Sequence, residues 1–364
     1  MNNFKKIVAL LLMLKVELLY ANSTQRDSLF SNLNFSTYFE TYYTYDFDNN
    51  NEKIRGIVNH HKNNELAINM ALIRANYASD YIRTNLGIMI GSYADKNYSG
   101  LDASYKYIYE SNVGVKLSKK QNIWFDIGIM PSHIGIETAI GIDNWTLTRS
   151  LQAEASPYYE AGARLSYTSK NEKLYASILV LNGWQVITKP SNFPLSLGTQ
   201  LQYKPTKRLL INSSTYLGNN NSSISNFVRP RYFHNFYTQI QISNKFSTII
   251  GLDIGAEEIW NKANSFNIWY APIILGKYAI NNKHSISCRA EYLDDQQKNI
   301  FPTNSVYGFV GFGYSINYDL QLNKYSMFRV EAKIFNTEDP LFNDGQISRN
   351  SNKAINTSFI FYID

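Results

Sequence analysis

The sequence predicts an all-β protein: a transmembrane, antiparallel, up-and-down β-barrel of about sixteen strands, with about fourteen or about eighteen as alternatives. From Leu33 onward, apolar and polar side chains alternate, which is typical of a strand with one apolar and one polar face. Most of these runs are close to the length of a tilted membrane-crossing strand, about 9–11 residues. The connections between them alternate between long and short, as the outer loops and periplasmic turns of membrane barrels do.

The N-terminal residues predict a signal peptide that spans residues 1–21 and is removed on export. Lys5 and Lys6 precede an apolar run that ends near Leu14, and Ala21 is a plausible cleavage residue. An uncleaved amphipathic N-terminus is the alternative. Together with the barrel pattern, the signal peptide predicts that the mature protein resides in the outer membrane.

Composition favours one barrel domain at residues 33–364, preceded by a polar lead-in at 22–32. Mean hydropathy is −0.30, and no internal apolar run reaches the length of about 18 residues that a membrane-spanning helix needs. The lone Cys288 excludes an intramolecular disulfide and a cysteine-based zinc site. The net charge of +6 is not gathered into a basic stripe, so no nucleic-acid partner is predicted. No repeat of propeller length is present either.

The alternation that defines the strands is clear in the run at 81–93, where Leu86 and Ile88 have the opposite parity to Arg83 and Asn85. Tyrosines and tryptophans near the ends of many runs suit the aromatic girdles of a membrane barrel. Strands are predicted at 33–47, 65–77, 81–93, 105–117, 123–130, 158–168, 174–184, 196–204, 209–217, 231–242, 246–256, 268–279, 285–292, 306–319, 327–335 and 354–363.

The predicted connections fall into two classes. Long connections are predicted at 48–64, 94–104, 131–157, 185–195, 218–230, 257–267, 293–305 and 336–353. Short connections are predicted at 78–80, 118–122, 169–173, 205–208, 243–245, 280–284 and 320–326. An even number of strands places both ends of the barrel on the side of the short turns, and a soluble β-sandwich has no reason to sort its connections in this way.

The polar face of the strands is expected to line the lumen. A barrel of about sixteen strands is too wide for its own side chains to fill, so its interior is aqueous. Charged residues of both signs occur on the polar parity, and buried charges need either a partner or water. Glu160, Arg164 and Arg329 are therefore candidate pore-lining residues.

The third long connection, residues 131–157, is too apolar for a loop in water, since it contains Ile140 and Trp145. A long connection of this kind inside a compact fold is usually functional. We expect it to fold back into the barrel, where its ionisable side chains would narrow the channel and influence selectivity. The alternative is an outer cap with solvated charges. The candidate constriction residues in this segment are His133, Glu137, Asp143, Arg149 and Glu154.

Several segments resemble a known family. They include M-P-S-H-I-G-I-E-T-A-I-G from Met130, D-N-W-T-L-T-R-S-L from Asp143 and S-P-Y-Y-E-A-G-A-R-L from Ser156. Others, such as Y-Y-T-Y-D-F at Tyr42 and L-V-L-N-G-W-Q at Leu179, extend the match over nearly the whole chain. The chain resembles the OmpL-like group of outer-membrane β-barrel porins. The resemblance implies a channel for passive diffusion of small hydrophilic solutes or ions, surrounded by outer-membrane lipid.

Two other functions stay open: an outer-membrane barrel enzyme of the lipase or protease type, and a plugged structural barrel. Ser132 and His133 are adjacent, as are His284 and Ser285, so the members of each pair would face opposite sides of a strand. We therefore predict no catalytic residue and no enzymatic activity. The histidines do not reach structural zinc spacing, so no metal or cofactor is predicted. The transported solute and the oligomeric state are left open.

Overall fold

The computed structural model describes residues 31–47, 57–98, 104–191, 193–220, 229–259, 262, 265–303, 305–343 and 348–364. The predicted signal peptide at 1–21 and nearly all of the lead-in at 22–32 lie outside the described residues. The predicted removal of the signal peptide therefore stays a prediction.

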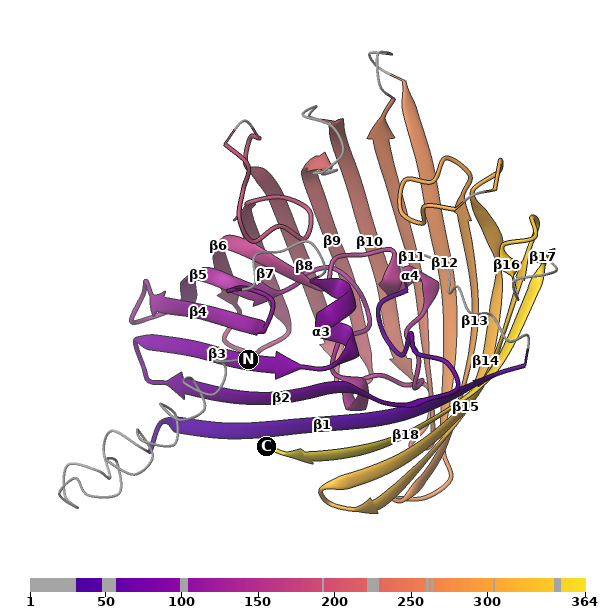
Figure 1. Cartoon of the computed structure of the whole chain (residues 1–364). Helices are drawn as coiled ribbons and strands as arrows, with labels where there is room; N and C mark the ends of the chain where they lie inside the picture. Colours follow the sequence, from indigo (N-terminus) through magenta and orange to yellow (C-terminus); the bar gives the residue numbers. More distant parts are fainter. Residues whose placement is uncertain are drawn as a thin grey trace.

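In the described part of the chain, sixteen strands form one closed antiparallel barrel (Figure 1). Neighbours in the barrel are neighbours in the chain, and the ring closes where the first strand pairs with the last, from Thr37 opposite Ile363 to Asp46 opposite Ala354. This confirms the predicted fold class. The barrel strands are β1 (Leu33–Asp46), β2 (Leu66–Ala78), β3 (Ile82–Ile90), β4 (Ile108–Lys116), β5 (Asn122–Pro131), β6 (Tyr159–Thr168), β7 (Leu174–Leu181), β8 (Ser196–Thr206), β9 (Leu209–Asn220), β10 (Arg229–Gln241), β11 (Phe246–Glu258), β12 (Phe266–Ala279), β13 (His284–Asp295), β14 (Phe309–Asn323), β15 (Ser326–Thr337) and β18 (Ser351–Ile363).

Several short elements lie in the long connections. The helix α3 (Ser92–Asn97) follows β3, and the 3-10 helix η1 (Gly141–Asp143) and the helix α4 (Leu151–Glu154) lie between β5 and β6. A small two-stranded sheet pairs β16 (Phe342–Asn343) with β17 (Ser348–Arg349). Among the described residues, no helix is both long enough and apolar enough to cross a membrane.

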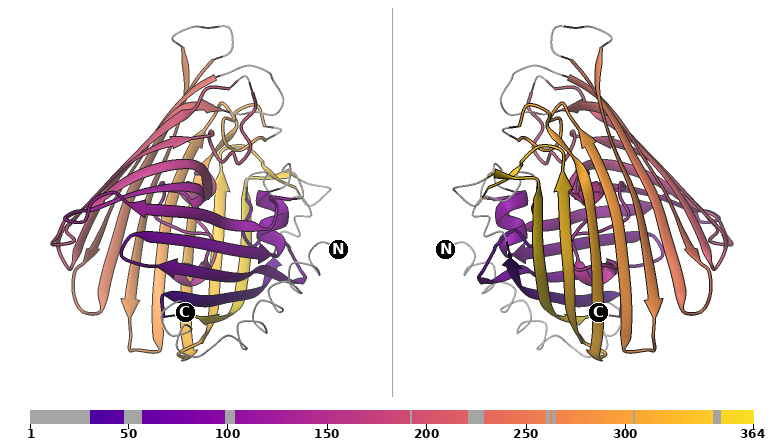
Figure 2. Two further views of the ribbon diagram at one scale, coloured as in Figure 1. Left: turned by 90° about the vertical axis from the view of Figure 1, so that its left-hand side faces the viewer. Right: turned by 90° about the vertical axis from the view of Figure 1, so that its right-hand side faces the viewer.

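The connections are sorted by length between the two ends of the barrel, as predicted. Figure 2 shows the tight turns at one end and the long connections at the other, with the C-terminus near the tight turns. The pairing of Thr37 with Ile363 brings the start of β1 to this same end. Sequential antiparallel strands require this arrangement, because every second connection must lie at the same end.

The two faces of the wall differ as the alternation predicts. In β10, Tyr232 and Phe236 are exposed on the outer face, whereas Arg231 and Asn235 are buried on the inner face. The inner face is nevertheless not polar throughout. Ile273, for example, is buried and pairs with Glu291, which also faces inward. The apolar inner positions lie where connections from the long-loop end pack against the wall.

Two predicted strands end three residues earlier than expected, and in both cases a glycine follows. The run predicted to reach residue 93 stops at Ile90, because Gly91 adopts a φ of 129° and the chain then turns into α3. A Cβ at this position would lie 2.5 Å from the carbonyl oxygen of Asn69, so only glycine fits. Similarly, β7 ends at Leu181 rather than at residue 184, before Gly183 with a φ of 151°.

Candidate functional site

The third loop, defined here as residues 131–157 between β5 and β6, lies among side chains from the inner faces of distant strands. Its backbone N–H groups donate hydrogen bonds to side chains of β1, β10, β13, β14 and β15. Figure 1 shows α4, which belongs to this loop, framed by the ring of strands. Because these strands occupy different sides of the barrel, the loop crosses its interior.

Arg329 of β15 holds the middle of the third loop. Its guanidinium donates to the carbonyl oxygens of Gly141 and Asn144, at 2.8 and 2.9 Å, and its Nε donates to Asp319 Oδ1 at 2.7 Å. The side chain is fully buried. A planar guanidinium has five N–H donors, so one arginine can bind a carboxylate and several carbonyls at once. Asp319 therefore neutralises the charge of Arg329, and carbonyl groups of the loop accept its remaining hydrogen bonds.

A second group of inner-face charges holds the following turn of the loop. Arg289 Nη1 donates to the carbonyl oxygen of Thr148 at 2.7 Å, while Glu331 Oε2 accepts from the Thr148 N–H at 2.6 Å. Glu291 Oε2 accepts from the Leu151 N–H at 2.5 Å, just where α4 begins. Arg289 also lies 3.2 Å from Glu331, so the two side chains neutralise each other while each binds the loop. Such charge-assisted hydrogen bonds are stronger than neutral ones.

The start of the loop is fixed to the opposite part of the wall by His133. Its Nδ1 lies 2.7 Å from Glu160 Oε2, and its Nε2 lies 2.9 Å from the carbonyl oxygen of Thr215. Both ring nitrogens face acceptors, which fits a doubly protonated imidazolium. Burial lowers the pKa of His133, but the Glu160 carboxylate outweighs it and the net shift is upward. The ring lies close against Gly198, where a Cβ would come within 2.8 Å of it.

The loop is also ordered by its own side chains. Arg149 Nε donates to the carbonyl oxygen of Thr138 at 2.6 Å, and its Nη2 donates to that of Ala139 at 2.7 Å. Glu137 Oε2 accepts from both the N–H and the hydroxyl of Ser150, at 2.7 and 2.6 Å. These contacts tie the first half of the loop to α4, so the loop behaves as a folded unit.

Apolar side chains of the loop pack, partly buried, against the wall. Ile140 and Ile142 pack on a cluster that includes Met70 of β2, and Trp145 packs on a cluster that includes Ile273 of β12. Removing apolar surface from water contributes about 25 cal/mol per Å². The apolar composition that marked this segment in the sequence is thus explained by contacts inside the barrel.

Glu154 joins the third loop to the first long connection. Its carboxylate accepts hydrogen bonds from the backbone N–H groups of Val58 and Asn59, at 2.9 and 3.3 Å. Burial raises the pKa of Glu154 to about 7, and the hydrogen bonds from Val58 and Asn59 only partly offset this rise. The group therefore changes charge close to neutral pH.

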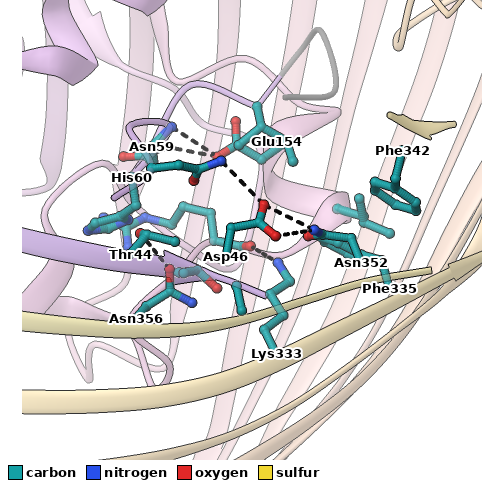
Figure 3. Close-up of a pocket in the computed structure, with 16 residues that line it drawn as sticks. Thr44, Asp46, Asn59, His60, Glu154, Lys333, Phe335, Phe342, Asn352 and Asn356 are labelled. Atoms are coloured by element: carbon teal, nitrogen blue, oxygen red, sulfur yellow. Dashed lines mark hydrogen bonds between the residues drawn. The ribbon is translucent and has the colours of Figure 1, made fainter. Parts of the chain in front are cut away.

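A small cavity of about 70 Å³, lined by both polar and apolar side chains, lies between the third loop and the wall formed by β1, β15 and β18 (Figure 3). It has room for about five water molecules. Across it, Asn352 Nδ2 donates to Asp46 Oδ1 at 2.9 Å, and Lys333 Nζ donates to the carbonyl oxygen of Arg149 at 3.1 Å. Its polar lining also includes Thr44, Asn59, His60, Asn63, Thr148, Glu154 and Asn356, and its apolar lining consists of Ile57, Leu151, Phe335, Phe342 and Ala354.

Paired charges also line the inner face of β2 to β6. Arg83 donates to both carboxylate oxygens of Asp126, at 2.7 and 2.6 Å, and Arg164 contacts the same carboxylate at 3.3 Å. Arg74 donates to Glu110 at 2.8 Å. The three arginine side chains remain partly exposed, whereas both carboxylates are buried. This part of the wall therefore presents guanidinium groups to the lumen.

The candidate residues named from the sequence occupy different environments. Asp143 is exposed, Arg164 and Glu154 are partly buried, and the others are buried: His133, Glu137, Arg149, Glu160 and Arg329. The buried ones bind the loop or its contacts with the wall. A pore-lining role for these side chains stays a prediction, and it fits Asp143 and Arg164 better than the buried group.

Sequence reasoning did not select Arg289, Glu291 and Glu331 as site residues, although they are buried on the inner face. It also did not select Asp126 and Arg83. Alternation identifies which face a residue occupies. It carries no information about which inner-face residues lie opposite the third loop, because that depends on barrel closure.

Comparison of the sequence with known families decides the identity of the chain. Residues 32–363 match the family described as "Putative beta-barrel porin-2, OmpL-like". The chain belongs to this family. The match spans every barrel strand, so it confirms the resemblance seen in the sequence segments and places the porin in the outer membrane. Comparison with curated proteins gives no significant match.

Solved structures share the fold of this porin. The outer-membrane channel DcaP of Acinetobacter baumannii is similar with a TM-score of 0.59 and 10% identity, over 91% of this chain and 97% of that chain. OmpT of Vibrio cholerae has a TM-score of 0.56 and 10% identity, with coverages of 91% and 97%. An anion-selective porin from Comamonas acidovorans has a TM-score of 0.57 and 9% identity, with coverages of 91% and 99%. At these identities the likeness shows the barrel fold.

Proposed function

We propose that this porin is a non-enzymatic channel for the passive diffusion of small hydrophilic solutes and ions, and that the third loop sets its width. The observation that carries the proposal is the loop itself. A sixteen-stranded barrel is too wide to be filled by its own wall. In this porin a loop crosses the interior and is held there by Arg289, Arg329 and Glu331.

The cavity beside the third loop supports a narrow solute path along β1, β15 and β18. Its lining carries charges of both signs, from Asp46, Glu154, Arg149 and Lys333. Its volume of about 70 Å³ holds only a few water molecules, so the path is narrow here. We therefore expect a low conductance for wild-type protein.

A plugged barrel is the second candidate, and one observation favours it. The third loop contacts several sides of the wall, with apolar clusters near β2 and β12 as well as polar contacts to β13 and β15. A loop held on all these sides could close the lumen. The two candidates differ in whether wild-type protein conducts at all.

The decisive experiment removes residues 141–153 and measures single-channel currents in planar bilayers. This span contains the backbone groups that Arg329 and Arg289 bind, so its loss leaves the strands intact and empties the middle of the lumen. We expect a larger conductance than in wild type. Heat-modifiable migration on a gel checks that the variant still forms a barrel. Asp143→Asn is the matched control, because it changes one exposed loop charge without removing the loop.

The outcomes separate the candidates. Asp143→Asn should shift the reversal potential toward anions at nearly unchanged conductance, because it removes a negative charge. Conductance that appears only after the deletion would establish a plug. A folded deletion variant that conducts as wild type does would show that the loop does not set the width. If neither protein conducts, the channel proposal is wrong.

A further inference from the structure

The short turns of this porin carry a marked excess of positive charge. Every short turn after the first contains lysine, and the side chains are exposed. The acidic residues in these turns are Asp80 and Glu172. The basic residues are Lys119, Lys120, Lys170, Lys173, Lys207, Arg208, Lys245, Lys283 and Lys324, with Lys204 at the end of β8.

Four of these cations converge on one depression. A pocket of about 800 Å³ lies between the β6–β7 turn, the β8–β9 turn and the ends of β9, β10 and β11. We name it the basic pocket and define it by Lys173, Lys204, Lys207 and Arg208. Glu172 is the acidic residue among its described lining residues. The lining is completed by Asn171, Pro205, Thr206, Leu209, Leu210, Gln239, Gln241 and Ser247.

The basic pocket opens toward the lumen rather than toward lipid. In β10, alternate residues up to Tyr237 are buried on the inner face, and Gln239 and Gln241 continue the same parity. Their cross-strand partners Leu210 and Ser247 line the same pocket, as does Lys204. Successive side chains on a strand alternate between faces, so Gln239 and Gln241 face inward at the channel mouth.

The cations of the basic pocket differ from the other inner-face cations. Elsewhere on the wall, Arg83 shares a carboxylate with Arg164, and Arg329 binds Asp319. Among the ion pairs of the described residues, none involves a cation of the basic pocket. The guanidinium of Arg208 donates a long hydrogen bond of 3.3 Å to Asn244 Oδ1, which carries no charge. The positive charge of the pocket is therefore available to a ligand.

We propose that the basic pocket binds small multivalent oxyanions of the phosphate class as they pass the short-turn mouth of the channel. The Arg208 guanidinium matches two phosphate oxygens, and the lysines act as mobile point charges. The amide groups of Gln239 and Gln241 supply further donors. The anion's route rests on the proposed channel function, but binding at the mouth does not.

The test measures binding of inorganic pyrophosphate to the full barrel in neutral detergent by titration calorimetry at low salt. The pocket variant combines Lys173→Gln, Lys204→Gln, Lys207→Gln and Arg208→Gln. The matched control combines four substitutions that remove the same charge from the same rim, outside the pocket: Lys119→Gln, Lys120→Gln, Lys283→Gln and Lys324→Gln. All these side chains are exposed, so both variants should fold, which heat-modifiable migration will check.

We expect wild type to bind pyrophosphate, with an affinity that falls as salt is raised. The pocket variant should bind about tenfold more weakly or worse, and the control should stay within about threefold of wild type. Equal losses in both variants would show a diffuse rim charge and overturn the proposal. Absence of wild-type binding would overturn it as well.

A lipid headgroup offers the same phosphate chemistry, so the titration is repeated in nanodiscs. Equal binding in phosphatidylcholine and phosphatidylglycerol discs would support a soluble anion at the mouth. Loss of pyrophosphate binding only in phosphatidylglycerol would assign the pocket to the lipid and overturn the proposal. Pyrophosphate binding without bilayer conductance would overturn the channel function but support anion binding in the basic pocket. Conductance without pyrophosphate binding would support the channel function and overturn the proposal for the basic pocket.

Discussion

Neighbouring residues on one strand of this porin face different environments, the lipid outside the barrel and the lumen inside it. In β3, Leu86 is 40% exposed on the outer face, in the middle of the strand. Asn85 faces inward, where its amide accepts from Asn76 and donates to Asn112, at 2.6 and 2.8 Å. Successive side chains on a strand point to opposite faces of the sheet, so these two side chains lie on opposite sides of the barrel wall. A charge placed at one position should therefore cost far more than at the other.

Leu86→Arg should destabilise the barrel by about 2–4 kcal/mol, because it places a charge on the lipid face near the bilayer centre. Asn85→Arg should cost much less, since the lumen can hydrate the guanidinium. Urea unfolding in lipid vesicles measures both free energies. Equal costs would mean that the inner and outer faces are assigned the wrong way round.

Glu154 should make docking of the third loop depend on pH. Its pKa is about 7 in the docked loop and 4.5 for an ordinary glutamate, so the docked state favours the protonated form. Docking is then strongest below about pH 4.5, weakens as the pH rises to about 7, and changes little above that. Current fluctuations in planar bilayers should become more frequent over this range. Glu154→Gln should remove the trend, and an unchanged trend in that variant would assign it to another group.

At the scale of elements, the third loop is a folded unit attached to the wall at several points. Its start is fixed by His133 and its middle by Arg289 and Arg329, which come from strands far along the chain. Docking of the loop requires close packing against the wall as well as charge pairing. The His133 ring lies over Gly198 of β8, so this strand must lack a side chain there.

Gly198→Ala should destabilise the folded porin by about 1–3 kcal/mol, because the added methyl group would lie 2.8 Å from the His133 ring. Gly276→Ala is the matched control in another strand, where the nearest atom would be 3.5 Å away and no clash arises. Unfolding free energies in urea measure both. A cost at Gly198 no greater than that at Gly276 would show that the loop can shift without loss.

The whole molecule has two unlike ends. Long connections and the third loop belong to one end, while tight, lysine-rich turns and both ends of the barrel wall belong to the other. Membrane barrels of this kind place their long loops outside the cell and their short turns in the periplasm. Chain order sorts the connections between the two ends, and the orientation of these ends in the membrane is a prediction.

Protease treatment of intact cells should therefore cut the long connections, such as the one between β9 and β10. It should spare the short turns, such as the one between β10 and β11, until the outer membrane is permeabilised. Mass spectrometry of the released peptides identifies the sites. Cuts confined to the short turns in intact cells would invert the topology and contradict the assignment of the two ends.

The sequence by itself determined the strands, their number and the sorting of their connections. Both patterns are local: side-chain alternation has a period of two, and connection length can be counted along the chain. The predicted strand ends were wrong near Gly91 and Gly183. There the positive φ of a glycine ends the strand, although the side chains in the sequence still alternate. The helices α3 and α4 were likewise not predicted, because each is too short for a helical period to show.

Only the tertiary structure decided what the inner-face charges do. No local pattern indicates that Arg149 binds carbonyls of its own loop, whereas Asp143, from the same segment, remains exposed. It also could not show that Arg329 would meet Gly141, which lies far earlier in the chain. Such contacts form only when the first and last strands pair and bring distant inner faces around a common lumen. The physical reason is that alternation fixes the face of each residue, while closure of the barrel fixes its neighbours.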